Sequence, residues 1–144
     1  MTIGYAFVVG DLLHIGHLEF FRKCKEYCDV LFVGVYTDEL TESYKRTPII
    51  PYEERFELVN ALKLVDKTVT VRNRDCTPMM KKLAAWGWKL DFLFHGDDWN
   101  LDTDEDLKKS KEYIESIGGK LILTPYHKGQ NTTMIIDKIK EAET

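Results

Sequence analysis

Two histidines three residues apart, His14 and His17, are the side chains of this sequence best suited to chemistry on a phosphate group. They lie between an apolar, β-rich run and a helical apolar pattern that begins at His17, so they bracket a strand-to-helix junction. Imidazole N–H groups and the free amides of a helix N-terminus both attract anions. Gly16 stands between the histidines and would let the backbone come close to a ligand. The pattern favours a phosphate-binding loop over a pair of capping or packing histidines.

Zinc is a weaker alternative for these histidines, because two imidazoles need further ligands. The cysteines, Cys24, Cys28 and Cys76, are odd in number and form no C-x-x-C pair, which argues against a zinc ribbon and against a disulfide framework. Cys24 and Cys28 are four residues apart in an apolar periodic stretch, so we expect both on one buried helix face. This cysteine usage is typical of a reduced, cytoplasmic protein.

The composition is that of a globular chain, since 44% of the 144 residues are hydrophobic and 31% are charged. The net charge of −4 argues against a nucleic-acid platform, although it allows a local cationic pocket. No apolar run approaches the ~20 residues of a membrane span, and residues 1–7 lack the basic start of a signal peptide. We therefore expect a single domain over residues 1–144, with no nucleic-acid partner and no membrane span.

Apolar, β-rich runs alternate with helical patterns along the whole chain. The expected strands cover residues 3–9, 30–36, 67–71, 92–95 and 121–123. The expected helices begin at residues 17, 52, 77, 103 and 131 or 132, with Thr77 as the cap before Pro78, and residues 37–51 form a loop with one short helical turn. Such alternation predicts an α/β fold with a doubly wound, parallel, five-stranded sheet.

A sheet of this kind binds its ligands beyond the carboxyl ends of the strands, near the point where the strand order reverses. The conspicuous polar residues lie in segments that follow expected strands, namely 10–17, 37–46, 96–99 and 126–133. We therefore expect these four segments to form the ligand site.

His14-Ile15-Gly16-His17 resembles the H-x-G-H signature of the nucleotidyltransferase superfamily. Further segments occur in the order, and at about the spacing, of the small cytidylyltransferases: Asp11-Leu12-Leu13, Thr37-Asp38-Glu39, Glu53-Glu54-Arg55, Val65-Asp66, Gly96-Asp97-Asp98-Trp99 and Asn131-Thr132-Thr133. The sequence is most similar to the glycerol-3-phosphate cytidylyltransferase type, over almost the whole chain. The resemblance implies a Rossmann-like, HUP-type nucleotidyltransferase domain and a homodimer.

The resemblance also implies roles for individual residues. The residues with catalytic phosphate contacts would be His14, His17, Lys45 and Arg46. The nucleotide would be bound by Val9, Gly10, Asp11, Gly16, His17, Lys63, Gly96, Asp97, Trp99, Asn131, Thr132 and Thr133. The acceptor would be bound by Asp11, Asp38, Arg55, Tyr126 and His127.

Each of these assignments has a structural alternative. Lys45 and Arg46 could be solvated charges, and Arg55 could be a surface partner of nearby glutamates. Residues 96–99 could be a polar turn, and residues 131–133 could be a helix cap. His95 ends an expected strand and suits a core position as well as a pocket position.

The implied reaction transfers a cytidylyl group from CTP to a small phosphorylated or phosphonate alcohol and releases pyrophosphate. A phosphomonoester has a second pKa near ~6, so the acceptor is already anionic at pH 7 and no general base is needed. We expect Mg²⁺ to accompany the triphosphate, without a metal site of the protein's own. The alternatives are an adenylyltransferase that resembles archaeal FAD synthetase or the heptose-phosphate enzyme, and a nucleotide-binding homologue without turnover. The Gly96–Trp99 segment favours the cytidylyl branch.

Two departures from the family pattern lie where the phosphates and the acceptor are expected. Val9 stands in place of a threonine, while Tyr126, Lys128 and Asn131 stand in place of an arginine, a glutamate and a serine. These changes argue against glycerol 3-phosphate itself. A hydroxyalkyl- or aminoalkyl-phosphonate fits the same anion chemistry. A glycerol 3-phosphate-like alcohol, phosphocholine and phosphoethanolamine stay open as acceptors, although the sequence shows no aromatic box for a quaternary ammonium group.

Overall fold

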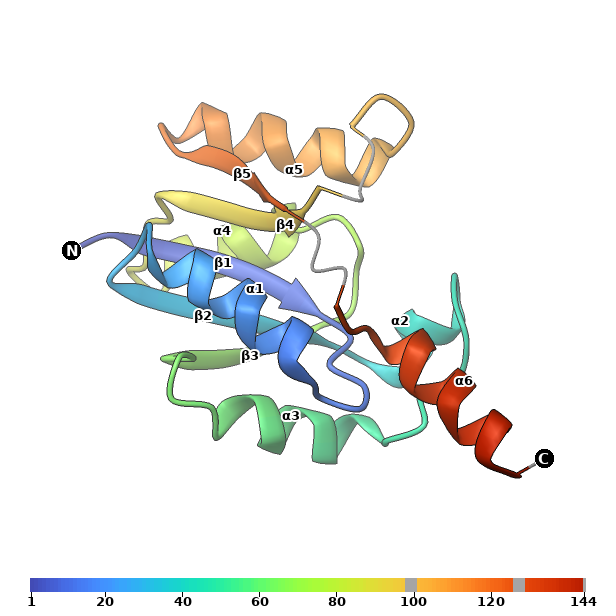
Figure 1. Cartoon of the computed structure of the whole chain (residues 1–144). Coiled ribbons are helices and arrows are strands. Elements are labelled where there is room, and N and C mark those ends of the chain that lie inside the picture. The colour runs from blue at the N-terminus through green and yellow to red at the C-terminus, as the bar shows by residue number, and fades with distance from the viewer. Residues whose placement is uncertain (98–100, 126–128, 144) are drawn as a thin grey trace.

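The computed structural model describes residues 1–97, 101–125 and 129–143 (Figure 1). The described residues form a parallel sheet with the strand order β3-β2-β1-β4-β5. The strands are β1 (Ile3–Val8), β2 (Val30–Tyr36), β3 (Lys67–Val71), β4 (Phe92–Gly96) and β5 (Lys120–Thr124). The helices are α1 (Ile15–Lys25), α2 (Asp38–Glu42), α3 (Tyr52–Asn60), α4 (Thr77–Ala85), α5 (Glu105–Ser116) and α6 (Thr132–Glu143).

Helices cover both faces of this sheet, which explains why the strands are nearly continuous apolar runs. On one face, residues of α1 and α3 such as Phe21 and Val59 pack with the β2 residue Val33. On the other face, residues of α4 and α5 such as Leu83 and Ile114 pack in one cluster with β1 and β2. The arrangement confirms the doubly wound α/β fold predicted from the alternation of strands and helices.

Four local predictions differ from the structure. The helix expected from residue 103 begins at Glu105, because Asp104 caps it by accepting the Leu107 amide. Helix α1 begins at Ile15 rather than at residue 17, because the His14 side chain accepts the Gly16 amide and caps the helix two residues earlier. Helix α4 is capped by Cys76, so Thr77 is its first residue and not its cap. Cys28 is buried but follows the end of α1, so it does not share a helix face with Cys24.

The strand order reverses at β1, which lies between β2 and β4. The connections from β1 and β4 lead to opposite sides there, and such a reversal opens a crevice at the carboxyl ends of the strands. Helix α6 follows β5 and lies at this edge, where Figure 1 shows it extending away from the sheet, and none of its residues is buried. Among the described residues, no helix has the length and apolar character needed to span a bilayer.

Candidate active site

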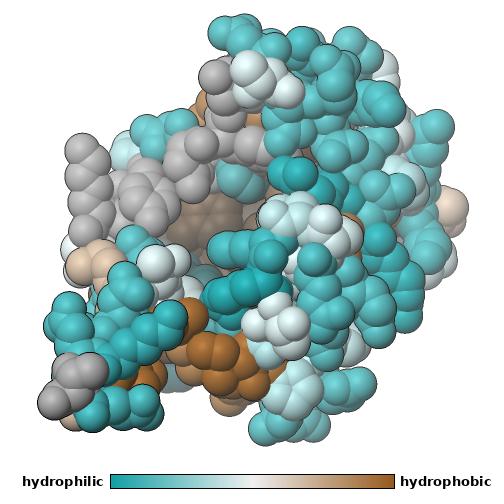
Figure 2. Space-filling model, turned by 90° about the vertical axis from the view of Figure 1, so that its right-hand side faces the viewer, coloured by the Kyte–Doolittle hydropathy of each residue, from teal (hydrophilic) through white to brown (hydrophobic). Residues whose placement is uncertain are grey.

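A pocket of about 540 Å³ lies at the carboxyl edge of the sheet, within the size range usual for small-molecule sites. Residues that end or follow every one of the strands line it, together with the start of α6. Figure 2 looks onto this edge and shows a hollow framed largely by hydrophilic side chains. The predicted location of the ligand site, at the carboxyl ends of the strands, therefore coincides with the pocket.

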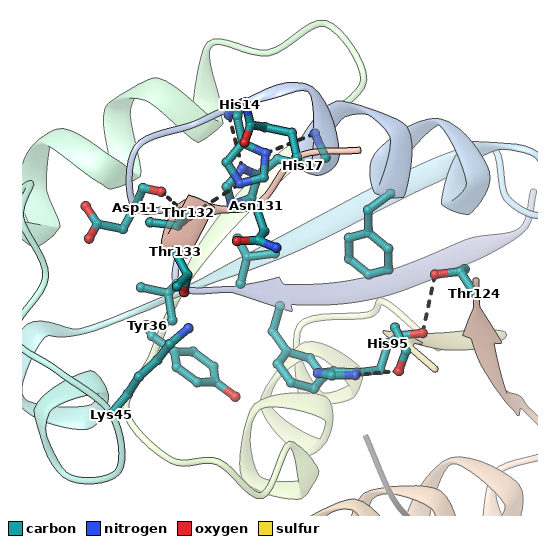
Figure 3. A pocket seen from close by; sticks show the side chains of 18 of the residues that line it. Asp11, His14, His17, Tyr36, Lys45, His95, Thr124, Asn131, Thr132 and Thr133 are labelled. Carbon is teal, nitrogen blue, oxygen red and sulfur yellow. Dashed lines mark hydrogen bonds between the residues drawn. The ribbon is translucent and has the colours of Figure 1, made fainter. Parts of the chain in front are cut away.

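His14 and His17 stand together at the start of α1, with ring centroids 4.0 Å apart (Figure 3). The Gly16 amide donates to Nδ1 of His14 over 3.0 Å, and the His14 amide donates to Nδ1 of His17 over 3.2 Å. An Nδ1 that accepts an amide proton carries no proton itself, so each ring holds its proton on Nε2. The backbone thus presents both imidazoles as Nε2–H donors.

The charge state of His17 agrees with this tautomer. The pKa of His17 is lowered to about 3, mainly by burial and also by the neighbouring His14 and Lys45, against the opposing effect of Asp11. The ring is therefore neutral near pH 7.

Thr132, the first residue of α6, links that helix to residues 11–17, here called the histidine loop. Its hydroxyl donates to the carbonyl oxygen of Asp11 over 2.9 Å and lies 3.3 Å from Nε2 of His14. Since Nε2 of His14 carries the proton, the imidazole donates to the threonine oxygen, which in turn donates to the backbone. The start of α6 and the histidine loop therefore form one hydrogen-bonded unit.

Position 16 requires glycine for a structural reason that the sequence did not indicate. A Cβ at this position would lie 2.7 Å from the backbone oxygen of Gln130 and 2.7 Å from Cε1 of His14. We predicted that Gly16 lets the backbone approach a ligand, and the structure shows that it lets the segment before α6 approach α1.

Asp11 is almost completely buried, with 1% of its side chain exposed. It accepts hydrogen bonds from the Ile49 and Ile50 amides over 2.9 and 3.0 Å and from the Arg46 guanidinium over 2.6 Å. Burial alone would raise the pKa of Asp11, but these donors outweigh burial and hold the pKa below its usual value. Asp11 thus fixes Arg46 and the 46–50 loop at the pocket wall and does not present an open carboxylate to a ligand.

Arg55 and Asp38 do not support the predicted contact with the acceptor. The Arg55 side chain is 0% exposed and is not part of the pocket lining. It donates to the carbonyl oxygens of Val9, Tyr36 and Ile50, and pairs with Asp38 over 2.6 Å. Arg55 therefore joins the ends of β1 and β2 to the loop before α3, and neither the predicted role nor its surface alternative describes it.

The structure brings most of the remaining predicted residues to the pocket. Its lining includes Val9, Gly10, Lys45, Gly96, Asn131 and Thr133. Asp97 is exposed beside the pocket but does not line it, and Lys63 is exposed in the turn between α3 and β3, at the opposite edge of the sheet. Lys63 therefore lies away from the pocket that the other predicted residues line. Trp99, Tyr126 and His127 lie outside the described residues, as do Asp98 and Lys128.

Several lining residues were not predicted. Tyr36 and Thr124 end strands, and Arg74 follows β3, so the rule that placed the site at the carboxyl ends of strands could have found them. Lys23 reaches the pocket from α1, and Gln130 precedes α6 with a buried Oε1 that has no partner within the described ranges. The sequence left open whether His95 faces the core or the pocket. His95 lines the pocket, and its ring centroid lies 5.1 Å from that of Phe7.

The charges around the pocket have one predominant sign. Its described lining carries the cations Lys23, Lys45, Arg46 and Arg74, and its one described carboxylate, Asp11, is paired with Arg46. The protein therefore offers a positive pocket although its net charge is −4. Such a pocket suits a polyanion.

A resident metal does not fit this donor set. In the parts of the chain that the structure describes, no three His, Cys, Asp or Glu side chains form a group that could hold a metal ion. Both oxygens of Asp11 already accept hydrogen bonds. The described side chains of the pocket therefore suit an anion better than a resident metal ion.

Comparison with known proteins places this site in a family. FAD synthase from Thermococcus sibiricus is 36% identical over 142 residues, which cover 92% of this chain and 88% of that protein. The bifunctional protein HldE from Geobacter metallireducens is 34% identical over 134 residues, and ethanolamine-phosphate cytidylyltransferase from Mus musculus is 34% identical over 111 residues. This chain spans about a quarter of the length of those two relatives, 26% in each case.

A solved structure and a family model agree with these relatives. The lipopolysaccharide core biosynthesis protein from Thermoplasma volcanium superposes with a TM-score of 0.68 at 25% identity, over 90% of this chain and 99% of that one. The family model described as cytidylyltransferase-like matches residues 10–138, which include both histidines and the start of α6. These findings confirm the resemblance read from the sequence and support an enzyme. The chain belongs to the cytidylyltransferase-like family.

Proposed function

We propose that this protein transfers a nucleotidyl group, in the first instance cytidylyl from CTP, to a small phosphate or phosphonate acceptor and releases pyrophosphate. One observation carries the proposal: two imidazoles are locked by backbone amides as neutral Nε2–H donors at a helix N-terminus inside a cationic pocket. Such fixed donors stabilise negative charge that develops on a phosphate without reorganising during the reaction.

In the proposed reaction, an oxygen of the acceptor attacks the α-phosphorus of the nucleotide. A new P–O bond forms there, while the bond from the α-phosphorus to the bridging oxygen breaks and pyrophosphate leaves with the electron pair. The acceptor oxygen is already anionic, so no side chain has to remove a proton. His17 donates its Nε2–H to an oxygen of the reacting phosphate, and His14 adds a second donor when its Nε2–H exchanges the Thr132 hydroxyl for a phosphate oxygen. Lys45 and Arg46 neutralise charge on the triphosphate.

Magnesium belongs to this proposal only as a companion of the nucleotide. The described residues offer no metal cage, so Mg²⁺ would be bound by phosphate oxygens and supply charge neutralisation. A homodimer and a cytoplasmic location remain predictions from the family resemblance and from cysteine usage.

Adenylyl transfer from ATP is the second candidate. The match to FAD synthase, which covers 88% of that relative, favours it. The match to ethanolamine-phosphate cytidylyltransferase, over 73% of this chain, favours CTP. The Gly96–Trp99 segment, which favoured CTP in the sequence, lies partly outside the described residues.

Thermal unfolding with Mg²⁺ and each of CTP, ATP, GTP and UTP tests the choice of nucleotide. A nucleotide at 100 times its Kd adds about 2.7 kcal/mol of stability, so the midpoint should rise by several degrees with CTP and much less with the others. A rise specific to ATP would instead establish the adenylyl reading.

Pyrophosphate release over a panel of phosphate and phosphonate acceptors then tests turnover. Release that requires both CTP and an acceptor supports the proposal. Nucleotide binding without release from any acceptor would contradict it and favour the non-catalytic homologue.

A further inference from the structure

Arg74, which follows β3, lines the pocket and pairs with Asp104, the cap of α5, on the face of the sheet that α4 and α5 cover. The histidines stand at the start of α1, on the opposite face. Two steps along the sheet, from β3 through β2, separate Arg74 from β1, whose following loop carries the histidines. At about 4.8 Å per strand, the ends of β1 and β3 lie about 10 Å apart. A small acceptor whose phosphate or phosphonate lies at the histidines would therefore point its other end toward Arg74.

Arg74 is held in place. Its guanidinium carbon lies 4.4 Å from the centre of the Tyr44 ring, and Nη2 is 3.2 Å from a carboxylate oxygen of Asp104. Asp104 is itself anchored, because it caps α5 by accepting the Leu107 amide. With 31% of its side chain exposed, Arg74 presents a fixed, planar, charged group at the pocket wall.

The surroundings of Arg74 disfavour a cationic ligand. An ammonium group is bound either by carboxylates or by open aromatic faces. The described lining holds one carboxylate, the buried and paired Asp11. Asp104 lies beside Arg74 but is already paired with it. Among the rings, Tyr36 and Phe7 are each only 4% exposed, and Tyr44 already contacts the Arg74 guanidinium. Phe20 is partly exposed, but it lies on α1 with the histidines.

We propose that the acceptor carries a carboxylate at the end remote from its reacting phosphate or phosphonate, and that Arg74 binds this carboxylate. The planar fork of a guanidinium matches a carboxylate and rejects an ammonium group by charge. Arg74 is then the residue that selects the acceptor. This inference rests on the proposed function and specifies its substrate class.

Three phosphonates that differ only at the remote end test the inference: 3-phosphonopropionate with a carboxylate, 2-hydroxyethylphosphonate with a hydroxyl and 2-aminoethylphosphonate with an ammonium group. Their Kd values are measured by calorimetry, alone and with a CTP analogue whose α,β-bridge is a methylene. We expect the carboxylate compound to bind at least tenfold more tightly than the ammonium compound. Equal affinities, absence of binding or tighter binding of the ammonium compound would overturn the inference.

Variants at position 74 assign the selectivity to the residue. Arg74→Gln should raise the Kd of the carboxylate compound about tenfold and should change the Kd of the hydroxyl compound less than threefold. Arg74→Lys keeps the charge and should keep the order of the three compounds. Arg72→Gln removes an exposed arginine outside the described pocket lining and serves as the matched control. An equal loss for all three compounds in Arg74→Gln would reduce Arg74 to a structural role and refute the assignment.

Binding and turnover separate this inference from the proposed function. Selective binding of the carboxylate compound without pyrophosphate release would support the role of Arg74 and contradict nucleotidyl transfer. Pyrophosphate release with equal use of all three phosphonates would support the transfer and contradict the inference.

Discussion

His14 and His17 owe their tautomer to main-chain amides and not to a carboxylate. Nδ1 of His14 is occupied by the Gly16 amide, and Nδ1 of His17 by the His14 amide. His95 has the opposite arrangement, because its Nδ1 lies 2.9 Å from the carbonyl oxygen of Gly96, which can only accept. Residues of one type in one pocket therefore present different faces to a ligand.

A pair of substitutions at His17 separates its two nitrogens. An asparagine places an oxygen near Nδ1 and keeps the bond to the His14 amide, but it removes the donor at Nε2. We expect His17→Asn to lower kcat by about 10²–10³-fold, the usual cost of one fixed donor to a transition state. His17→Gln places an amide nitrogen near Nε2 and should retain about tenfold more activity than His17→Asn.

Steady-state kinetics with saturating nucleotide gives the comparison, and far-UV circular dichroism checks that both variants fold. If His17→Asn were as active as the natural protein while chemistry limits the rate, the assigned donor role would be wrong.

Residue types with a local signature were predictable, and those defined by long-range contacts were not. His14 and His17 stand at a strand-to-helix junction that the sequence marks directly. The burial of Arg55 depends on carbonyl oxygens from three separate segments that meet only in the folded sheet. Arg74 is one of two arginines in the polar stretch after β3, and nothing in the sequence distinguishes it from Arg72.

At the scale of elements, α6 docks onto the start of α1 through a contact that leaves no room for a side chain at position 16. The Gln130 backbone oxygen and the His14 ring occupy the space of a Cβ. Thr132 then continues the contact to Asp11. The docking of α6 and the orientation of His14 are therefore one structural arrangement.

We expect Gly16→Ala to lower kcat/KM at least about tenfold, because the new methyl group displaces the segment before α6 or the His14 ring. Gly118→Ala is the matched control. Gly118 has φ +85° and no atoms within 4 Å of a Cβ, so alanine there should cost roughly 1 kcal/mol of stability without touching the site. Urea unfolding and pyrophosphate release, measured on both variants, distinguish the two effects. Equal activity losses would show that Gly16 matters for stability alone.

The strands were more predictable than the helix ends. Strands β2 and β3 occupy the predicted residues. Strand β2 is a continuous apolar run, which suits a sheet covered on both faces, and β3 is rich in the β-branched residues valine and threonine. The start of α1 was misplaced because histidine is not among the residues that usually cap helices, and here it does so through Nδ1. The short helix α2 lies within the predicted loop, where Thr37 caps it by accepting the Leu40 amide.

At the scale of the whole molecule, charge is unevenly distributed. The chain has a net charge of −4, yet the described lining of the pocket carries four cationic side chains. A positive hollow in a negative protein directs polyanions to one place and repels them elsewhere.

Nucleotide affinity should therefore depend on ionic strength. We expect the Kd of the preferred nucleoside triphosphate to rise about fivefold or more between 0.05 and 0.5 M NaCl. Salt at these concentrations screens the attraction between the cationic side chains and the phosphates. Calorimetry at constant free Mg²⁺ measures the change. The corresponding nucleoside, which lacks phosphates, is the control and should bind with the same Kd at both salt concentrations. A triphosphate Kd that is independent of salt would contradict a charge-based pocket.

The bond between His14 and Thr132 joins residues 118 positions apart in the chain. At roughly 5–20 residues per second, a ribosome makes the histidine about 6 to 24 s before the threonine that completes its hydrogen bonding. During that interval a nascent chain can pair its first strands, but its phosphate donors lack the wall formed by α6. The pocket is thus completed only after the start of α6 has been made, and a translation product that stops after β5 would hold both histidines without the hydroxyl that accepts from His14.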